Sequence, residues 1–330
     1  MKVLFSARFR DWLKNWQRRL LLLLASLRLK FGSKKANVND KNLSLLDLTG
    51  QISKELSRYP VAQGSFGDVW KCIRIRPRSE VAVKCLRLEV PDDDSKKQIT
   101  ERLEHELQRN TQLEHTNLLP VLGITQGFGL LPAIVSPWMQ KGSLTALLER
   151  DFQQLTLTRK LQILNDVASA LQYLHSKNIV HGDLTGNNIL ISENGNALVA
   201  DHGILLFCSE LHGTSYIRSN VRWAAPENFQ VPEDEESTSS PQLASDIYSF
   251  GCIMLQVFTG RVPYSEYRSD HQVTVRILRG QKPARPVTPP IADSLWDFMQ
   301  KCWIDADYRP SAKVVQEFIQ GQLKLSEEKS

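Results

Sequence analysis

Hydrophobic and polar positions follow two different rhythms along this chain. From Tyr59 the pattern is that of strands, with one apolar run over residues 61–69 and a second that ends at residues 81–84. Apolar residues then recur at three- and four-residue spacings, first over residues 96–113 and again over residues 158–175. Strands come first and helices follow, which indicates an α+β fold with a strand-rich part and a mainly helical part.

The first 35 residues carry a further pattern, that of a basic amphipathic helix. Its apolar and aromatic residues recur at helical spacing between Lys and Arg: Phe5, Phe9, Trp12, Leu13, Trp16, Leu20, Leu23, Leu24 and Leu27. The uninterrupted apolar run, residues 20–25, is far shorter than the roughly 20 residues that span a bilayer. We expect peripheral contact between residues 1–35 and an anionic membrane surface. Docking on the chain's own folded domain, a disordered tail and a mitochondrial targeting segment are the alternatives.

Composition and charge indicate a globular protein of a reducing, cytoplasmic compartment. Of the 330 residues, 42% are hydrophobic and 23% are charged, which suits one large domain or two lobes. The five cysteines lack Cys-x-x-Cys spacing, and their odd number argues against a disulfide framework. Residues 1–35 hold ten basic residues and one acidic residue, a net +9, so the remainder carries −4 of the total +5. Since the positive charge lies on a leader, we expect no nucleic-acid binding.

The segment from His181 to Gly203 has the spacing of a phosphoryl-transfer centre. Asp183 and Asn188 lie close together in the chain, and Asp201 follows a short hairpin-like stretch. Phosphoryl transfer needs one carboxylate to orient the attacking hydroxyl and further oxygen atoms to hold magnesium on the ATP phosphates. Asp183 is the candidate for the first task, and Asn188 and Asp201 are the candidates for the second.

A glycine-containing turn lies in the expected strand region upstream of this segment. Its residues are Val61, Ala62, Gln63, Gly64, Ser65, Phe66 and Gly67, and the strand continues through Val69. Glycines let backbone N–H groups approach phosphate oxygens without a side-chain clash. Such a turn alone is usually just a hairpin, and the lysine at position 84 on the next strand is what favours a phosphate site.

Together these segments resemble a eukaryotic protein kinase domain of the tyrosine-kinase-like group, over roughly residues 48–320. Later motifs carry the resemblance further: residues 222–227 are similar to a docking loop that ends in Ala-Pro-Glu, and residues 246–251 open a buried helix. The resemblance implies a bilobal fold with a small β-rich N-lobe and a larger, mainly α-helical C-lobe. It divides the chain into a leader (1–36), a lead-in (37–58), an N-lobe (59–136), a hinge (137–140), a C-lobe (141–322) and a polar tail (323–330).

The resemblance also implies sites for ATP and Mg²⁺. Lys84 matches the lysine that grips the α and β phosphates, and Glu106, with Glu104 as its rival, matches the carboxylate partner of that lysine. Glu227 and Arg309 would form a buried ion pair in the C-lobe. The adenine would lie among residues from both lobes and the hinge: Val69, Ala82 and Leu190 on its faces, backbone groups of Pro137 and Met139 at its edge, and Ser136 as a small gatekeeper.

Several positions depart from the family pattern. Gly182 replaces an arginine that usually pairs with an activation-loop phosphate, so we expect little dependence on that phosphorylation. Thr185 stands in place of a lysine near the γ-phosphate, and losing such a contact costs about 10²–10³ in rate by analogy with one oxyanion donor. His202 replaces an apolar Phe and Asn110 another apolar residue, so we expect the two to approach each other or share a partner. Asn220 replaces a Thr that ties the docking loop to the catalytic Asp.

These motifs predict an ATP-dependent protein kinase that phosphorylates protein hydroxyls, Ser/Thr rather than Tyr on group resemblance. Neither the substrate nor the oligomeric state follows from them. The acidic stretch 232–241 is expected to be a surface loop. Two alternatives stay open: a pseudokinase that binds nucleotide and serves as a scaffold or allosteric partner, and a small-molecule phosphotransferase of the aminoglycoside or choline type. The second alternative shares His-Gly-Asp with a later Asp but lacks the docking-loop motif.

Overall fold

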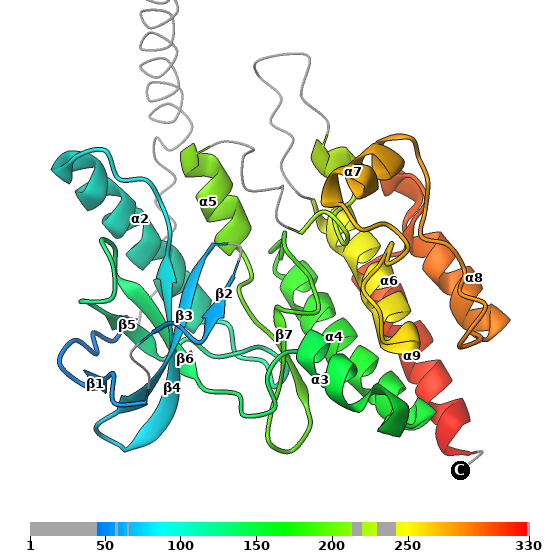
Figure 1. Ribbon diagram of the computed structural model, residues 1–330, viewed down its shortest axis with the longest axis horizontal. Coiled ribbons are helices and arrows are strands. Elements are labelled where there is room, and N and C mark those ends of the chain that lie inside the picture. The colour runs from blue at the N-terminus through cyan, green and yellow to red at the C-terminus, as the bar shows by residue number, and fades with distance from the viewer. Residues whose placement is uncertain (1–44, 57–58, 65, 213–219, 230–241, 329–330) are drawn as a thin grey trace, which may run out of the picture. The chain divides into compact units, whose positions relative to one another are not determined.

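The computed structural model describes residues 45–56, 59–64, 66–212, 220–229 and 242–328. The basic leader and the acidic stretch 232–241 lie outside these residues, so the expectations for both stay predictions. Residues 44–330 form one compact unit, in which Figure 1 shows a β-rich N-lobe with helix α2 on one side and a bundle of helices on the other. This division confirms the predicted bilobal kinase fold.

The N-lobe is built on an antiparallel sheet of six strands. The strand order is β1-β3-β4-β6-β5, with β2 paired to β3. The strands are β1 (Ile52–Ser53), β2 (Ala62–Gln63), β3 (Gly67–Arg74), β4 (Ser79–Leu86), β5 (Gly123–Thr125) and β6 (Ala133–Pro137). Alternate residues of β4, including Val81 and Val83, are buried in one hydrophobic cluster, which is the period-two pattern of a half-buried strand.

The sheet begins earlier in the chain than the predicted N-lobe start at residue 59. Leu48 is fully buried, and its backbone N–H donates to the carbonyl of Ile124 on β5 at 2.7 Å. Lys54 lies 4.1 Å from the ring centroid of Phe128 and 4.9 Å from that of Trp70. The described residues of the predicted lead-in therefore belong to the N-lobe, because they cover the edge of β5 before the chain enters the glycine turn.

Helix α2 (Asp93–Thr111) crosses the N-lobe sheet. Its N-cap residue Asp92 accepts a hydrogen bond from the backbone N–H of Ser95 at 2.7 Å, the usual way of satisfying a helix N-terminus. The buried side chains of α2 are Ile99, Leu103, Leu107 and Asn110.

A second helix, α5 (Ile204–His212), packs against α2 and was not predicted from the sequence. It begins three residues after Asp201, and Ile204, Leu205, Phe207 and Cys208 share one hydrophobic cluster with the apolar face of α2. Figure 1 shows α5 beside α2 at the junction of the two lobes.

The C-lobe surrounds the buried helix α6 (Leu243–Thr259), from whose third residue onward every residue is buried. The other described α-helices of the C-lobe are α3 (Leu144–Asp151), α4 (Leu157–Ser176), α7 (Asp270–Leu278), α8 (Asp293–Cys302) and α9 (Ala312–Glu327). The strands β7 (Ile189–Ile191) and β8 (Ala197–Val199) form a two-stranded sheet. Helix α9 continues through most of the predicted polar tail. Among the helices of the described residues, none has the length and apolar character needed to cross a bilayer.

Candidate active site

A cavity of about 760 Å³ lies where the sheet, the hinge and the C-lobe meet. Most of the predicted site residues line it: Ala62, Gln63, Gly64, Phe66, Val69, Ala82, Lys84, Ser136, Pro137, Met139, Asp183, Asn188, Leu190 and Asp201. Val61, Gly67 and Glu106 are not among its lining residues, and Ser65 lies outside the described residues. The cavity also has lining residues that sequence reasoning missed, such as Leu119, Val121 and Ile134, because apolar residues that line a cavity look like core residues in a sequence.

The glycines of the turn do not all have the role that the sequence predicts. A Cβ atom on Gly67 would lie 1.9 Å from the carbonyl oxygen of Cys85, so this glycine is required by the close approach of β3 to β4. Phe66 is buried in the cluster formed by α2 and α5. Arg87, another missed residue of the cavity wall, donates to the carbonyl of Gly64 at 2.7 Å. Gly67 thus shapes the turn rather than lining the cavity.

The hinge carries groups that suit the edge of an adenine. Ser136 pairs with Ala82 across β6 and β4, so both lie on the cavity wall. The carbonyl of Met139 accepts from the backbone N–H of Gly142 at 3.0 Å. Within the described residues, the N–H of Met139 makes no hydrogen bond, so this donor is available to a ligand.

Asp183 lies at the centre of a hydrogen-bond network on the floor of the cavity. The amide nitrogen of Asn188 donates to one carboxylate oxygen of Asp183 at 2.8 Å, and the amide nitrogen of Asn220 donates to both oxygens at 2.8 and 3.0 Å. Burial raises the pKa of Asp183 to about 7, although both asparagines act in the opposite direction. Asn220 therefore makes the tie between docking loop and Asp183 that the family makes with Thr.

Asp246, near the start of α6, binds the backbone of the catalytic loop, which is the segment from His181 to Asn188. Its two carboxylate oxygens accept from the N–H groups of His181 and Gly182 at 2.8 and 2.9 Å, and one of them also lies 2.9 Å from Nε2 of His175. Asp246 is only 1% exposed. The motif predicts a buried helix from residue 246 and assigns Asp246 no role; an acid at the head of a largely apolar run is the signal available for it.

The predicted pairing of Lys84 with Glu106 is not present in this structure. The ammonium of Lys84 instead forms a short ion pair with the carboxylate of Asp201. Glu106 lies 3.4 Å from Arg109 on its own helix, and an added Cβ on Gly203 would lie 3.5 Å from its carboxylate. The physical reason is the packing of α5 against α2, since the same short segment carries both Asp201 and the buried face of α5. The role of Glu106 in turnover stays a prediction.

Among the described residues, the structure gives His202 no hydrogen bond to Asn110 and no partner that the two residues could share. Both residues are buried and both line the cavity, but no hydrogen bond joins them. Within the described residues, neither ring nitrogen of His202 has a hydrogen-bond partner. Burial lowers the pKa of His202 to about 4, so the ring is neutral at physiological pH.

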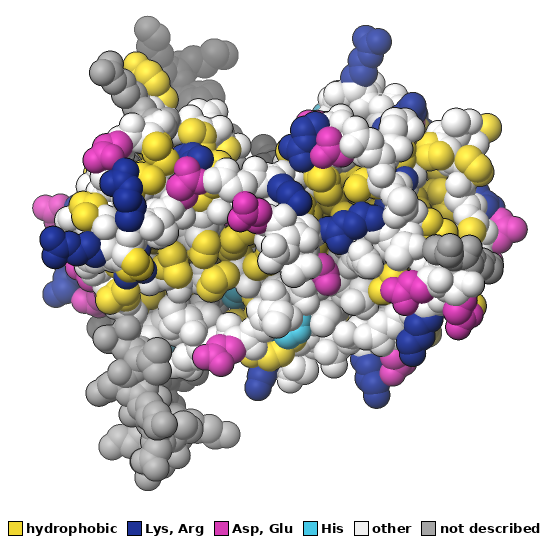
Figure 2. Space-filling model, turned by 90° about the horizontal axis from the view of Figure 1, so that it is seen from below, with side chains coloured by type: hydrophobic (Ala, Val, Ile, Leu, Met, Phe, Trp, Pro, Cys, Tyr) yellow, Lys and Arg dark blue, Asp and Glu magenta, His cyan; other side chains and the backbone are white. Residues whose placement is uncertain are grey.

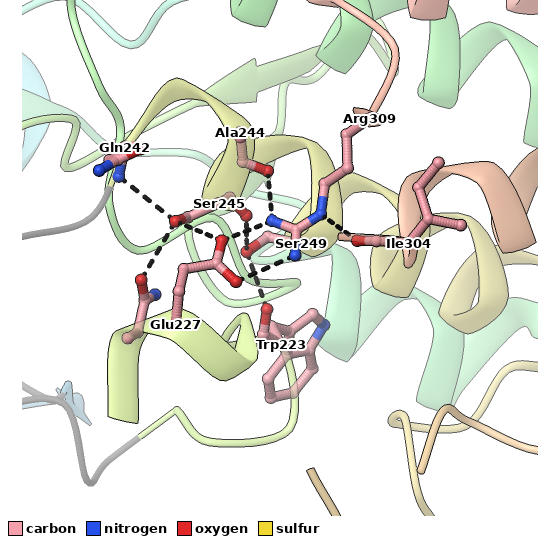
Figure 3. A network of polar contacts seen from close by, with 9 residues as sticks. Trp223, Glu227, Gln242, Ala244, Ser245, Ser249, Ile304 and Arg309 are labelled. Atoms are coloured by element: carbon pink, nitrogen blue, oxygen red, sulfur yellow. Dashed lines mark hydrogen bonds and ion pairs between the residues drawn. The ribbon is translucent and has the colours of Figure 1, made fainter. Parts of the chain in front are cut away.

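The predicted ion pair of the C-lobe is confirmed. Arg309 donates to both carboxylate oxygens of Glu227, in one case at 2.9 Å, and its side chain is 1% exposed. Figure 3 shows Arg309 reaching between Ala244 and Ile304, whose carbonyls accept two further hydrogen bonds at 2.9 Å. Burial raises the pKa of Glu227, but Arg309 outweighs this effect and holds that pKa below its usual value.

The residues of the cavity fit ATP and Mg²⁺. Asp201 and the amide oxygen of Asn188 are the kind of oxygen ligands that Mg²⁺ accepts alongside phosphate oxygens. Lys84 provides a cation beside Asp201, and the hinge residue Met139 provides a backbone N–H donor. Apolar side chains of Val69, Ala82 and Leu190 also line the cavity.

Figure 2 shows the charged side chains on one face of the described residues. Lys and Arg side chains are interspersed with Asp and Glu there rather than gathered into one basic stripe. The expectation that the chain binds no nucleic acid stays a prediction.

A β-rich lobe and a helical lobe that enclose a cavity with an Asp, an Asn, a second Asp and a Lys at these places define a protein kinase domain. Residues 57–319 match the model of the family described as protein tyrosine and serine/threonine kinase, and the chain belongs to this family. The match decides against the small-molecule phosphotransferase alternative.

Individual relatives agree with this assignment. The chain is similar to mitogen-activated protein kinase kinase kinase 5 of Arabidopsis thaliana, with 26% identity over 80% of this chain and 36% of the relative. It is 29% identical to the RAF proto-oncogene serine/threonine-protein kinase of Xenopus laevis over 67% of this chain and 33% of the relative. For serine/threonine-protein kinase STY46 of Arabidopsis thaliana, the identity is 28% over 79% and 43%. The chain thus spans less than half the length of these relatives. Their similarity confirms the predicted tyrosine-kinase-like group. None of the three is named a pseudokinase.

Proposed function

We propose that this chain is an ATP-dependent protein kinase that transfers the γ-phosphoryl group to serine or threonine hydroxyls of proteins. The observation that carries the proposal is the position of Asp183, which lines one cavity together with Lys84, Asn188 and Asp201. The carboxylate of Asp183 is held by Asn188 and Asn220 and has a pKa of about 7. A general base with a pKa near the working pH combines the right protonation state with a useful affinity for protons.

Each residue of the cavity floor has a task in this reaction. Asp183 orients the attacking hydroxyl and accepts its proton. Asn188 and Asp201 would hold Mg²⁺, which together with ATP supplies the transferable phosphoryl group and neutralises its charge. Since Asp201 is paired with Lys84 in the structure, binding of the metal has to compete with that ion pair.

Preference for serine and threonine rests on two observations. Two of the relatives above carry serine/threonine-protein kinase in their names. Asn220 also supplies the hydrogen bond to Asp183 that a threonine supplies in kinases of that specificity. The docking loop of this chain is therefore tied to the base in the manner of a Ser/Thr kinase.

The test is transfer of radiolabelled phosphate from ATP to the chain itself and to a generic protein substrate, followed by identification of the labelled amino acid. Asp183→Asn should lower transfer by about 10²–10⁴, the usual contribution of a general base. Asp297→Asn, an exposed change on α8, should retain full transfer. Equal transfer by the Asp183→Asn variant and the unaltered chain would overturn the proposal, and phosphotyrosine as the product would overturn its Ser/Thr part.

We also propose that residues 1–35 bring the domain to an anionic membrane surface from the cytoplasm. The support is the net +9 of the leader and its aromatic residues at helical spacing. A fluorescent protein carrying residues 1–35 should bind vesicles with phosphatidylserine and lose most of this binding in high salt. A fusion in which the ten basic residues are replaced by glutamine is the control, and equal binding by both fusions would contradict the proposal.

A further inference from the structure

Gln256 is a buried polar side chain in the middle of the C-lobe that the proposed mechanism does not use. It lies on α6 and is 1% exposed. Its amide oxygen accepts a hydrogen bond from the indole nitrogen of Trp223 at 3.2 Å, and its amide nitrogen donates to the hydroxyl of Thr145 at 3.1 Å. Because one end of the amide accepts and the other donates, these two partners fix its orientation.

The backbone of the catalytic loop rests directly on this amide. A Cβ atom on Gly186 would lie 2.5 Å from the amide oxygen of Gln256 and 2.6 Å from the hydroxyl oxygen of Thr145. The backbone N–H of Thr145 donates to the carbonyl of Gly186 at 3.1 Å. Only glycine fits here, and it lies between Asp183 and Asn188, the two residues whose relative position matters most for the chemistry.

The other side of Gln256 holds the docking loop. The carbonyl of Trp223 accepts from Ser249 of α6 at 2.8 Å, as Figure 3 shows, so α6 grips this residue at both its backbone and its indole ring. Asn220, three residues earlier in the chain, donates to Asp183. The docking loop is thus joined to the catalytic loop by a direct route through Asn220 and by a second route that passes through Gln256.

We propose that Gln256 is a positioning residue that sets the catalytic loop relative to the docking loop, an inference that rests on the proposed kinase function. The side chain does not line the cavity and makes no hydrogen bond to Asp183, so it acts on the reaction through Trp223, Thr145 and Gly186. A displacement of reacting groups by about 1 Å can cost about 100-fold in rate. Loss of the amide therefore lowers kcat and leaves the KM for ATP unchanged, because the hinge and the glycine turn are not involved.

Gln256→Met tests this inference, because methionine has nearly the same length but neither donor nor acceptor. We expect kcat for a peptide substrate to fall by about 10- to 100-fold, with an unchanged KM for ATP. Thr259→Val is the matched control: Thr259 is a buried polar residue of the same helix whose hydroxyl, in the part of the chain that the structure describes, bonds to Leu255 and Arg261. Thr259→Val should retain kcat even if it lowers the melting temperature as much as Gln256→Met does. Equal losses of kcat in the two variants would overturn the inference.

A double-mutant cycle with Trp223→Phe separates coupling from general damage. If the indole nitrogen acts through Gln256, the double variant should have the same kcat as Gln256→Met alone. Losses that multiply would mean independent effects and would overturn the inference.

Two readouts keep this result apart from a failure of the proposed function. The unaltered chain and Asp183→Asn are measured in the same assay, and an inactive unaltered chain would refute the kinase proposal itself. Amide hydrogen exchange over residues 183–188 needs no activity. We expect faster exchange there in Gln256→Met than in Thr259→Val, and equal exchange in both would count against the positioning role.

Discussion

Polar groups are buried in opposite ways in two regions of the molecule. One is the polar network that holds the docking loop in the C-lobe, here called the frame (Trp223, Glu227, Gln256 and Arg309), and the other is the junction between the two lobes. Around Arg309 and Gln256, donors and acceptors are matched, and each side chain has one arrangement that satisfies it. At the junction, His202 is buried with no partner for either ring nitrogen, and Lys84 has one carboxylate as partner while a second, Glu106, lies near the same segment.

The difference shows where this domain has a fixed structure and where it has a choice. A satisfied buried network has no alternative of similar free energy, because each lost hydrogen bond strands a buried group. Unpaired groups and exchangeable ion pairs leave room for a second arrangement. In the N-lobe that choice involves Lys84, since its present partner Asp201 is also a predicted ligand of the metal.

The largest effect should come from breaking the frame at Arg309. Arg309→Ala leaves Glu227 without its cation and should lower the free energy of unfolding by about 3–5 kcal/mol. Urea unfolding measures this change. Lys313→Ala removes a surface pair with Glu317, whose side chains are 74% and 61% exposed, and should cost no more than about 1 kcal/mol. Similar losses in both variants would show that the frame is not held by this pair.

At the junction between the lobes, replacing His202 by Phe should instead increase stability at low pH. The pKa of His202 is about 4 in the folded chain against 6.5 ordinarily, so between these values the unfolded state binds a proton that the folded state does not. Stability is therefore lost as the pH falls below 6.5, by about 2 kcal/mol at pH 5. His202→Phe removes this loss, which urea unfolding at pH 8 and pH 5 should show. His271→Gln, an exposed change on α7, should keep the loss, and an unchanged pH dependence in His202→Phe would contradict the assignment.

Asn220 lies where the two regions meet, and its loss should change the protonation of the base. Its hydrogen bonds lower the pKa of Asp183, which burial raises to about 7. Since Asp183 must be deprotonated to accept a proton, kcat/KM for peptide should fall below about pH 7 in the unaltered chain. In Asn220→Ala the midpoint of this fall in kcat/KM should move up by about one pH unit, which corresponds to the free energy of one hydrogen bond.

Asn220→Thr is the control for this shift, because threonine keeps one donor and should restore part of the original profile. A lower rate in Asn220→Ala with an unchanged midpoint of the pH profile would show that Asn220 acts on the shape of the loop and not on the base.

The smallest change in stability should follow from Glu106→Gln. Among the described residues its ion pair is with Arg109, whose side chain is 61% exposed, so the free energy of unfolding should change by less than about 1 kcal/mol. If Lys84 exchanges Asp201 for Glu106 during turnover, kcat should still fall by about 100-fold, the size of one lost oriented charge. Glu104→Gln is the matched control on the same helix. An unchanged kcat in Glu106→Gln would remove Glu106 from the predicted site.

Much of the site was predictable because its residues are specified by order and spacing. The cavity places Lys84, Asp183 and Asp201 together as the motifs imply, and Glu227 meets Arg309 as expected. The role of Gln256 was not predictable, because nothing in the pattern of α6 separates it from its buried neighbours. Its two hydrogen-bond partners, Trp223 and Thr145, and the backbone of Gly186 against which it packs come from three different segments that only folding brings together.

Helix α5 was missed for another reason. Residues 204–208 form a short apolar run, and a run of this length does not distinguish a helix from a strand or from core. Its helical form and its place against α2 depend on the space that α2, Phe66 and Leu86 leave open. That space is a property of the assembled lobe.

Motif order and hydrophobic period are properties of the chain alone, and they specify the fold class, the family and the set of groups that meet in the cavity. Which of these groups pair with one another depends on tertiary packing. Lys84 could form an ion pair with either Glu106 or Asp201, and both pairings satisfy its charge equally well as far as the sequence is concerned. The packing of α5 on α2 selected Asp201. Burial of apolar surface, which acts over the whole lobe, thus decided between two local electrostatic solutions.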